Sequence, residues 1–398
     1  MHPPGAETVV IRYGDMSTKS REVRSHFERL LTENIEALLA DRGVEGEVER
    51  IHARVLVEGP DPEAAARAAA DAFGVVSTSP ARTVAPEWDA IEDALREAAR
   101  ERFPGGTFAV RANRAAEFPM TSEEMERAGG TAVGETIEAS GGDPDVDLED
   151  PDVTFGVELR EDRAFVFLDR FDGPGGLPLG SQAPLVAMVS GGQDSPVAAY
   201  EAMRRGSPVI PVYVDLGDYG GADHRARAIE TVGRLARYAP DRDTRVRVVP
   251  GGEDVAHLVE TVERGRMLSW RRYVLRVGAA IARDHDAAGV VTGEAVGQKS
   301  SQTARNLQVT DAAVDLPVHR PLLSRDKNQI TERAKEVGTF RDSTIPAGCT
   351  RIAPPKPETN GRLDRLLQVE PDDLLERAER AAAEAELVDP REFGGDVP

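Results

Sequence analysis

The chain has 398 residues, which allows two or three domains, and its hydrophobic content of 40% is ample for buried cores. Asp and Glu (70) outnumber Lys and Arg (49), so the formal net charge is −21. This balance argues against nucleic-acid binding on charge alone. The argument weakens in molar salt, where counterion release contributes little and binding depends on shape and specific contacts.

The composition also indicates where the protein works. Lysine is scarce beside arginine, which suggests a salt-adapted, halophilic cytosol, although a high-GC genome also depletes lysine. The single cysteine, Cys349, excludes an intramolecular disulfide and any four-cysteine zinc or iron–sulfur site within one chain. The N-terminus MHPPGAE has no apolar signal-peptide core, and no spanning segment is evident. We therefore expect a soluble, cytoplasmic protein that does not associate with a membrane.

The first 85 residues predict a small ferredoxin-like domain. Asp61 and Pro62 suit the N-cap and first position of a helix, and seven apolar residues in 20–41 recur at helical spacing. The expected elements are strands at 8–14, 47–57 and 74–79 and helices at 20–41 and 61–72. A β-α-β-α-β order of this kind fits a ferredoxin-like domain.

A second unit begins near Pro86. Thr121 and Glu124 form the capping region of one of its helices. We expect helices at 88–102 and 121–137 and strands at 107–113, 153–159 and 163–169. The Gly- and Pro-rich stretch FDGPGGLPLGSQ that follows is typical of an interdomain connector.

From Pro184 onward, strands and helices alternate. Strands are expected at 185–189, 208–214, 244–249 and 289–293, and helices at 195–205, 223–238, 253–264, 268–285 and 326–338. This pattern predicts an α/β, doubly wound parallel sheet with its site at the carboxyl ends of the strands. Residues 358–388 are predicted to be helical and acidic, serving as a packing or solvated element.

The chemistry centres on residues 185–205, LVAMVSGGQDSPVAAYEAMRR. A buried strand is followed by Gly191 and Gly192, which allow a sharp turn and close approach to an anion. Ser195 suits the N-cap of the next helix and Pro196 its first position, so the helix N-terminus would face an anion. An ordinary strand–turn–helix junction is the alternative. The motif SGGxDS is more specific than such a junction requires, and it resembles the phosphate loop of ATP pyrophosphatases. It differs from the other common phosphate-binding loop, GxxxxGK[ST], which is absent here.

Two later segments carry polar residues after strands. VTGEAVGQKSSQT (291–303) contains Gly293, which allows close approach, and Gln302, which can hydrogen-bond, although a simple polar loop would look the same. In HRPLLSRDKNQI (319–330), Asp326 caps a helix and Lys327 lies in its first turn. A lysine there is unfavourable with respect to the helix dipole, so its presence suggests a nearby anion. The alternative is an exposed lysine that binds nothing.

Cys349 lies in IPAGCTRIAPPKP, a Gly- and Pro-rich segment with Arg351 nearby. A free cysteine is commonly a buried, inert side chain. A loop with a neighbouring cation instead favours a reactive thiolate.

The chain resembles the tRNA 4-thiouridine synthetase family (tRNA uridine-8 sulfurtransferases, also linked to thiamine biosynthesis) over nearly its whole length. The resemblance is carried by IRYGDMSTK, FAVRANRAAEFPMTSEEMER, VTFGVELREDRAFVF, GPGGLPLGS, SGGQDSPVAAY, TGEAVGQKSSQT, HRPLLSRDKNQI and CTRIAPPKPET, in this order. It implies an N-terminal ferredoxin-like domain (1–85), a THUMP RNA-binding domain (86–172), a linker (173–183) and an ATP pyrophosphatase domain (184–398).

The resemblance implies that ATP adenylates O4 of uridine 8 in tRNA and that sulfur then replaces AMP. Asp194, Lys327 and Cys349 match catalytic positions: the resemblance implies that Asp194 acts through Mg²⁺ and that Cys349 takes part in sulfur transfer. Arg271 stands where the family often has a lysine, which keeps the charge but changes the geometry. The implied ATP contacts are Met188, Val189, Ser190, Gly191, Gly192, Gln193, Asp194, Ser195, Tyr213, Val214, Arg271, Gly293 and Gln302.

The same resemblance implies a tRNA partner and a homodimer. Candidate RNA contacts are Lys19, Arg21, Arg24, Arg111, Arg114 and Arg170, although scattered arginines on acidic domains are often ion-paired. The chain lacks the rhodanese domain of many bacterial members and the extra cysteines and iron–sulfur cluster of some archaeal relatives. The sulfur donor is then a separate persulfide carrier, such as a cysteine desulfurase, or sulfide itself. A persulfide on Cys349 would need a thiol from elsewhere to resolve it.

Two other functions fit parts of the sequence. One is a different ATP pyrophosphatase reaction, such as tRNA 2-thiolation or an amidation, although no glutaminase domain is present. The other is a non-catalytic THUMP protein with an inactive loop, which the intact SGGxDS, Lys327 and Cys349 argue against. Thiamine thiazole synthesis is a further family role that the missing rhodanese domain makes less favoured.

Overall fold

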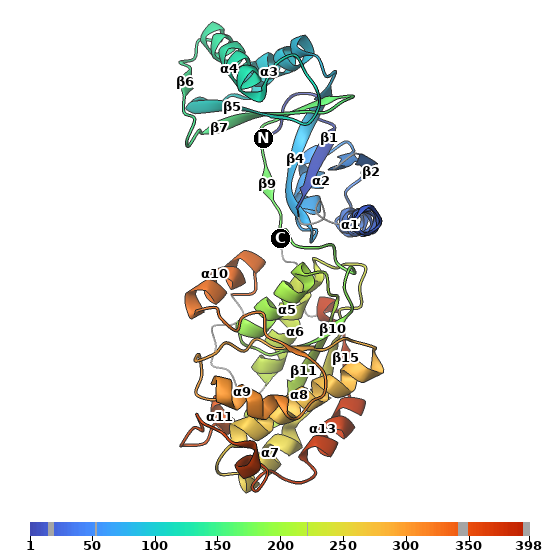
Figure 1. Ribbon diagram of the computed structural model, residues 1–398, viewed down its shortest axis with the longest axis vertical. Coiled ribbons are helices and arrows are strands. Elements are labelled where there is room, and N and C mark those ends of the chain that lie inside the picture. The colour runs from blue at the N-terminus through green and yellow to red at the C-terminus, as the bar shows by residue number, and fades with distance from the viewer. Residues whose placement is uncertain (15–19, 52–53, 221, 341–348, 393–398) are drawn as a thin grey trace. The chain divides into compact units, whose positions relative to one another are not determined.

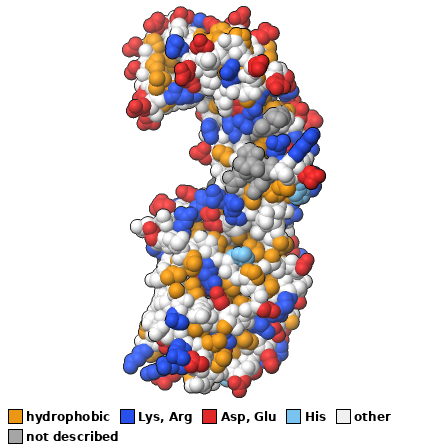
Figure 2. Space-filling model, viewed as in Figure 1, with side chains coloured by type: hydrophobic (Ala, Val, Ile, Leu, Met, Phe, Trp, Pro, Cys, Tyr) orange, Lys and Arg blue, Asp and Glu red, His pale blue; other side chains and the backbone are white. Residues whose placement is uncertain are grey.

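The computed structural model describes residues 1–14, 20–51, 54–220, 222–340 and 349–392. It divides into two compact units, Met1–Pro178 and Leu179–Pro398. Figure 1 labels their helices and strands. On the face shown in Figure 2, Lys and Arg side chains lie among Asp and Glu side chains on both units. Within the described ranges, every helix is too short or too polar to cross a membrane.

The first half of unit 1 has the order β-α-β-β-α-β, which is the ferredoxin-like order. Its elements are β1 (Thr8–Tyr13), α1 (Arg21–Asp41), β2 (Glu47–Ile51), β3 (Arg54–Glu58), α2 (Pro62–Ala70) and β4 (Val75–Val84). The prediction of one strand over 47–57 is wrong, because β2 and β3 are two antiparallel strands in which Ile51 pairs with Arg54. The Asp61 cap is confirmed, since its side chain accepts a hydrogen bond from the Ala64 amide at 2.9 Å.

The second half of unit 1 continues the same sheet. It contains α3 (Trp88–Arg102), β5 (Thr107–Arg114), α4 (Ser122–Ala139), β6 (Asp145–Val146), β7 (Val153–Leu159), β8 (Ala164–Phe167) and β9 (Phe171–Asp172). The strands follow the order β2-β3-β1-β4-β8-β7-β5-β6, and β9 also pairs with β4. The predicted capping box is confirmed: Thr121 and Glu124 bond each other's main-chain amides at the start of α4.

Each half of unit 1 has its own apolar core. Leu31, Ile35 and Leu38 of α1 pack with the alanines of α2 on one part of the sheet. Ile91 and Leu95 of α3 pack with Phe108 and Phe155 on the other part. The helices therefore form because their apolar stripes are covered by the sheet.

Unit 2 contains the predicted α/β doubly wound sheet, in the order β14-β13-β10-β11-β12-β15. Its strands are β10 (Leu185–Val189), β11 (Val209–Asp215), β12 (Val246–Pro250), β13 (Val290–Val291), β14 (Val318–His319) and β15 (Glu386–Val388). All pairings are parallel except that of β12 with β15. The chain order reverses between β10 and β13, so a switch point lies between these two strands.

Helices cover the sheet of unit 2 (Figure 1). They are α5 (Asp194–Arg204), α6 (Ala222–Ala236), α7 (Gly252–Thr261), α8 (Arg266–Asp284), α9 (Ala304–Asp311), α10 (Lys327–Val337), α11 (Cys349–Ile352), α12 (Leu363–Leu366) and α13 (Leu374–Ala383), with short 3₁₀ turns at Gly217–Tyr219 and Pro390–Glu392. Helix α8, in which most residues are buried, supplies much of the core, including Trp270, Tyr273 and Val277.

The expectation of helix throughout 358–388 is wrong. Two separate helices, α12 and α13, are followed by the edge strand β15, which pairs antiparallel with β12. The segment packs rather than being solvated, since Leu374 and Ala378 of α13 are buried in the core. Arg272 on α8 also forms a buried ion pair with Glu370 at 3.0 Å.

Candidate active site

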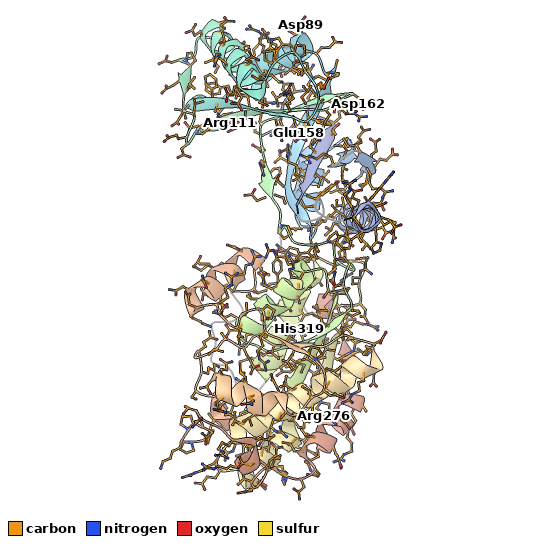
Figure 3. The ribbon with its side chains drawn as sticks, viewed as in Figure 1. Asp89, Arg111, Glu158, Asp162, Arg276 and His319 are labelled. Carbon is orange, nitrogen blue, oxygen red and sulfur yellow. The ribbon has the colours of Figure 1, made fainter. Side chains whose placement is uncertain are left out.

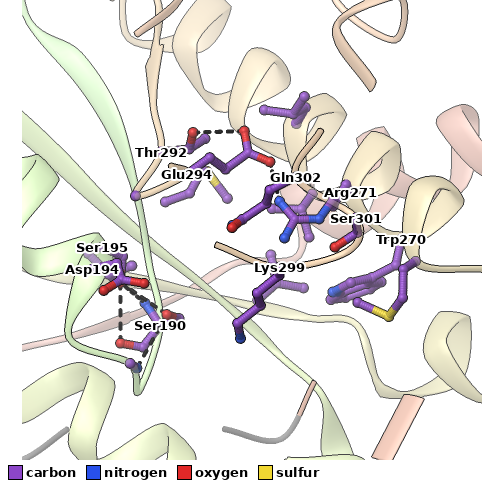
Figure 4. Close-up of a pocket in the computed structure, with 18 of the residues that line it drawn as sticks. Ser190, Asp194, Ser195, Trp270, Arg271, Thr292, Glu294, Lys299, Ser301 and Gln302 are labelled. Carbon is purple, nitrogen blue, oxygen red and sulfur yellow. Dashed lines mark hydrogen bonds and ion pairs between the residues drawn. The ribbon is translucent and has the colours of Figure 1, made fainter. Parts of the chain in front are cut away.

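A cavity of about 320 Å³ opens in unit 2. Its lining residues follow the carboxyl ends of β10, β11 and β13 and one side of α8 (Figure 4). This is the switch point of the sheet, where ligands bind in open α/β folds. The volume is within the usual range for a small-molecule site.

One wall of the cavity is apolar. Met188 and Val189 end β10, Tyr213 and Val214 lie near the end of β11, and Trp270 comes from α8. The Tyr213 hydroxyl is hydrogen-bonded to Nδ1 of the buried His224 at 2.9 Å. Such a wall suits a flat aromatic ring such as a nucleobase.

The loop after β10 closes on itself through Ser195. The Ser195 hydroxyl accepts a hydrogen bond from the Ser190 amide at 2.9 Å and bonds the Ser190 hydroxyl at 3.0 Å. The prediction that Ser195 is the N-cap is therefore wrong, because α5 begins at Asp194 with Gln193 as its N-cap. Pro196 is then the third helical residue, where a main-chain N–H would still have no partner within the helix.

Glycines allow close packing around this loop. Neither Gly191 nor Gly192 has a positive φ. A Cβ on Gly191 would lie 3.0 Å from Cδ2 of His224, so Gly191 is needed for contact with α6. A Cβ on Gly293 would lie 2.6 Å from the main chain of Asp194 and Ser195. Gly293 therefore lets the loop after β13 press against the start of α5.

Asp194 and Lys327 come together from elements 133 residues apart. Nζ of Lys327 donates to Oδ1 of Asp194 at 3.0 Å. The predicted cap is confirmed, since Asp326 forms a capping box with Gln329 at the start of α10. Gln193 also donates to the Thr331 hydroxyl at 3.0 Å, which fixes α10 beside the loop. Lys327 is about half exposed, so this pair adds little to stability, and its position beside the loop is what matters.

Arg271 lines the cavity and is held by two side chains. It forms an ion pair with the buried Glu294. When the side-chain amide of Gln302 is oriented with its oxygen toward Arg271, that oxygen accepts a hydrogen bond from Nη2 of Arg271 at 3.2 Å. Glu294 also accepts from Nε of Arg320 at 2.8 Å and from the Thr292 hydroxyl at 3.1 Å. Burial tends to raise the pKa of Glu294, but the charges of Arg271 and Arg320 outweigh it and lower that pKa. Glu294 therefore stays ionised and orients Arg271.

The structure thus brings most of the predicted ATP contacts to one cavity. Those that line it are Met188, Val189, Ser190, Gly192, Asp194, Ser195, Tyr213, Val214, Arg271, Gly293 and Gln302. Gly191 and Gln193 face α6 and α10 instead. Lys327 reaches the site through Asp194.

Cys349 is the first residue of α11, and its side chain lies outside the described residues. Ala353, which follows α11 directly, lines the cavity. Arg351 of α11 donates to the main-chain oxygen of Asp218 at 3.4 Å. The main chain of the cysteine segment therefore leads to the edge of the cavity.

The candidate RNA contacts all belong to unit 1. Lys19 lies outside the described residues, and Arg21 and Arg170 are exposed. Arg24 lies 3.8 Å from Glu28, and Arg111 donates to the main-chain oxygen of Leu148. Arg114 donates to the main-chain oxygen of Phe118 at 3.0 Å.

A cationic cluster in unit 1 was not predicted from the sequence. Glu158 on β7 is almost fully buried (Figure 3). It accepts from Nε of Arg12 at 2.9 Å, from Nε of Arg54 at 2.8 Å and from Nε of Arg160 at 3.1 Å. Arg12 also donates to the Ser79 hydroxyl at 3.0 Å. Three guanidinium groups therefore share one buried carboxylate.

Other site residues were also missed. Glu294, Lys299 and Arg320 lie within the quoted motifs TGEAVGQKSSQT and HRPLLSRDKNQI, but no local pattern separates them from their neighbours. Trp270 is marked only by its position on an apolar helix. In the described part of the chain, no group of three His, Cys, Asp or Glu side chains could hold a metal ion alone.

Comparisons with known proteins match the chain in three segments. A family described as thiamine biosynthesis protein (ThiI) matches residues 180–372, the THUMP domain matches 85–169, and the ThiI ferredoxin-like domain matches 8–79. A probable tRNA sulfurtransferase of Halobacterium salinarum is 56% identical over 96% of this chain and 98% of its own length. The chain belongs to the ThiI family of tRNA sulfurtransferases.

Other members of this family are similar over comparable lengths. A probable tRNA sulfurtransferase of Methanosarcina acetivorans is 36% identical over 90% of this chain and 88% of its own length. A crystal structure of a 4-thiouridine synthetase–RNA complex with bound ATP matches with a TM-score of 0.82 at 26% identity, over 96% of this chain and 99% of that chain. The chain is therefore an enzyme of the ThiI type, with ferredoxin-like, THUMP and α/β domains.

Proposed function

We propose that the enzyme is an ATP-dependent tRNA sulfurtransferase that makes 4-thiouridine at position 8 of tRNA. ATP adenylates O4 of the uracil, pyrophosphate leaves, and sulfur then replaces AMP. The observation that carries this proposal is the cavity itself, which combines a phosphate-loop sequence, an apolar wall and the Asp194–Lys327 pair. The ATP-bound 4-thiouridine synthetase complex, which matches nearly the whole chain, supports the same substrate and nucleotide.

In this proposal, the base of ATP lies on the apolar wall of the cavity and its phosphates lie on the loop after β10. The main-chain N–H groups at the start of α5 face the phosphates, as they do at helix N-termini that bind anions. Arg271, oriented by Glu294 and Gln302, supplies a fixed cation. Lys327 adds positive charge as pyrophosphate forms.

Mg²⁺ fits this site as a partner of the nucleotide. Magnesium is commonly held by one or two carboxylates together with substrate phosphates. Asp194, which lines the cavity on the phosphate loop, provides such a carboxylate. Magnesium would neutralise phosphate charge during adenylation.

The N-terminal domains bind tRNA in this proposal. We assign residues 1–85 to the ferredoxin-like domain, 86–172 to the THUMP domain, 173–183 to the linker and 184–398 to the catalytic domain. Arg21, Arg24, Arg111, Arg114 and Arg170, with Lys19, supply RNA contacts in addition to the cluster around Glu158. A homodimer working in the cytoplasm completes the proposal.

The proposal is tested by the products formed from ATP. Purified enzyme, Mg²⁺, ATP and unmodified tRNA with sulfide should release AMP and pyrophosphate in proportion to the 4-thiouridine formed. The same tRNA with uridine 8 changed to cytidine should give neither product. Formation of ADP and phosphate, or 2-thiouridine in place of 4-thiouridine, would contradict the proposal.

Replacing Cys349 with serine tests the sulfur step separately. If the thiol carries sulfur from a persulfide donor, Cys349→Ser should lose thiolation with that donor, because serine cannot form a persulfide. Adenylation, followed as pyrophosphate release, should persist, while AMP stays on the uracil because no sulfur displaces it. Full thiolation by Cys349→Ser with a persulfide donor would rule out the thiol role and leave the adenylation role intact.

A further inference from the structure

Lys299 extends into the cavity from the loop between β13 and α9 (Figure 4). Its side chain is exposed, while its main chain is fixed in a tight turn. The amide of Gln302 donates to the Lys299 oxygen at 2.8 Å, and the amide of Gly297 donates to the Gln302 oxygen at 3.0 Å. The main chain of Lys299 is therefore held beside the cavity, while its flexible side chain lets the ammonium group move.

Among the residues that the structure describes, Lys299 has no acidic partner. Among the described residues, Arg271 and Lys299 are the Lys and Arg side chains that line the cavity. Arg271 is paired with Glu294, and Asp194 on the opposite side is paired with Lys327. No described carboxylate lies within ion-pair distance of Lys299, so its charge is available to a ligand.

The composition of the chain makes this lysine unusual. The lysines of the whole sequence are at positions 19, 299, 327, 335 and 356, among 49 Lys and Arg residues. Lys335 pairs with Glu332 on α10 at 2.8 Å, and Lys327 pairs with Asp194. A chain that uses arginine almost throughout thus has a lysine in its cavity. The charge of the substrate shifts during the reaction. The compact ammonium group of lysine, on its flexible side chain, can follow such a shift better than the rigid, planar guanidinium group of arginine.

We propose that Lys299 binds the β- and γ-phosphates of ATP and stabilises the departing pyrophosphate. This inference rests on the proposed ATP reaction and adds a second, mobile cation to its phosphate site. ATP carries more negative charge than AMP, and the net charge of −21 repels both. An unpaired cation at the cavity offsets this repulsion most strongly for the triphosphate.

The inference is tested by calorimetric titration of the full chain with ATP and with AMP, each in the presence of Mg²⁺. Lys299→Met should weaken ATP binding about five- to tenfold and change AMP binding by less than about twofold. Lys299→Arg should keep most of the ATP affinity because it keeps the charge. The difference between wild type and Lys299→Met should shrink at higher KCl, where exposed charges are screened.

The control is Lys335→Met, which removes a lysine that pairs with Glu332 on α10 and should leave both affinities unchanged. Unchanged ATP affinity in Lys299→Met would overturn the inference. Equal losses for ATP and AMP would also overturn it, because they would indicate a distorted cavity. A wild-type protein that binds ATP through Lys299 but makes no 4-thiouridine would instead refute the proposed function alone.

Discussion

Replacing Asp194 with alanine is expected to reduce tRNA thiolation by about 10³-fold or more while the protein stays folded. Asp194 lines the cavity on the phosphate loop and pairs with Lys327 at 3.0 Å. Its loss removes the loop carboxylate proposed for Mg²⁺ and frees Lys327 from its position. Single-turnover thiolation assays with saturating tRNA measure the effect, and circular dichroism monitors folding.

Asp194→Asn and Lys327→Met separate charge from shape. Asp194→Asn keeps the volume of the side chain, so a similarly large loss would assign the effect to the carboxylate charge. Because Asp194 and Lys327 act on the same phosphates, the double variant should lose less than the product of the two single losses. Thiolation by Asp194→Ala within about tenfold of wild type would refute a catalytic role for this residue.

Replacing Glu158 with alanine is expected to destabilise the protein by about 3–5 kcal/mol. Arg12, Arg54 and Arg160 all donate to this one buried carboxylate. Without it, the three partly buried arginines lose the carboxylate to which they all donate. The change in the free energy of unfolding is measured by chemical denaturation, monitored with a spectroscopic signal that comes from unit 1. Weaker tRNA binding should accompany it, because the arginines would lose their fixed positions.

Glu161→Ala is the matched control, since Glu161 is exposed in the turn between β7 and β8. It should change the free energy of unfolding by less than about 0.5 kcal/mol. A change in Glu158→Ala no larger than this would mean that the arginines are stable without their carboxylate.

Acid should remove the contribution of Glu158. Burial alone would raise its pKa, but the charges of Arg12, Arg54 and Arg160 outweigh burial and lower the pKa below the ordinary value of 4.5. The folded state therefore binds this proton less readily than the unfolded state. The contribution is complete above the ordinary pKa and is lost as pH falls through the lowered value. The stability difference between wild type and Glu158→Gln should shrink over that acidic range.

Much of the fold could be predicted because local signals agree with tertiary packing. The predicted and observed bounds of α3 coincide, since its apolar residues recur at helical spacing over the whole element. The hairpin of β2 and β3 was missed because EVERIHARVLV alternates without Gly, Pro or Asn to mark a turn. The strand β15 was missed because its three residues form an edge strand only by pairing with β12.

Site residues could be proposed from the sequence where they belong to a local motif. They could not be proposed where they depend on contacts between side chains that are far apart in the sequence. The SGGxDS loop and Lys327 were predicted from residue types that suit phosphate binding, and the structure places the loop in the cavity wall and Lys327 beside it. The contacts of Glu158 with Arg12 and Arg54 join residues 146 and 104 positions apart, which no sequence spacing shows. The role of Ser195 was misjudged for a different, local reason: its hydroxyl bonds Ser190 within the loop instead of capping α5, which begins at Asp194.

The most direct test is nucleoside analysis of tRNA from a strain that lacks this gene. Mass spectrometry should find no 4-thiouridine in that tRNA, with restoration by the wild-type gene but not by the Asp194→Ala variant. Unchanged 4-thiouridine in the deletion strain would contradict the account that this enzyme makes it.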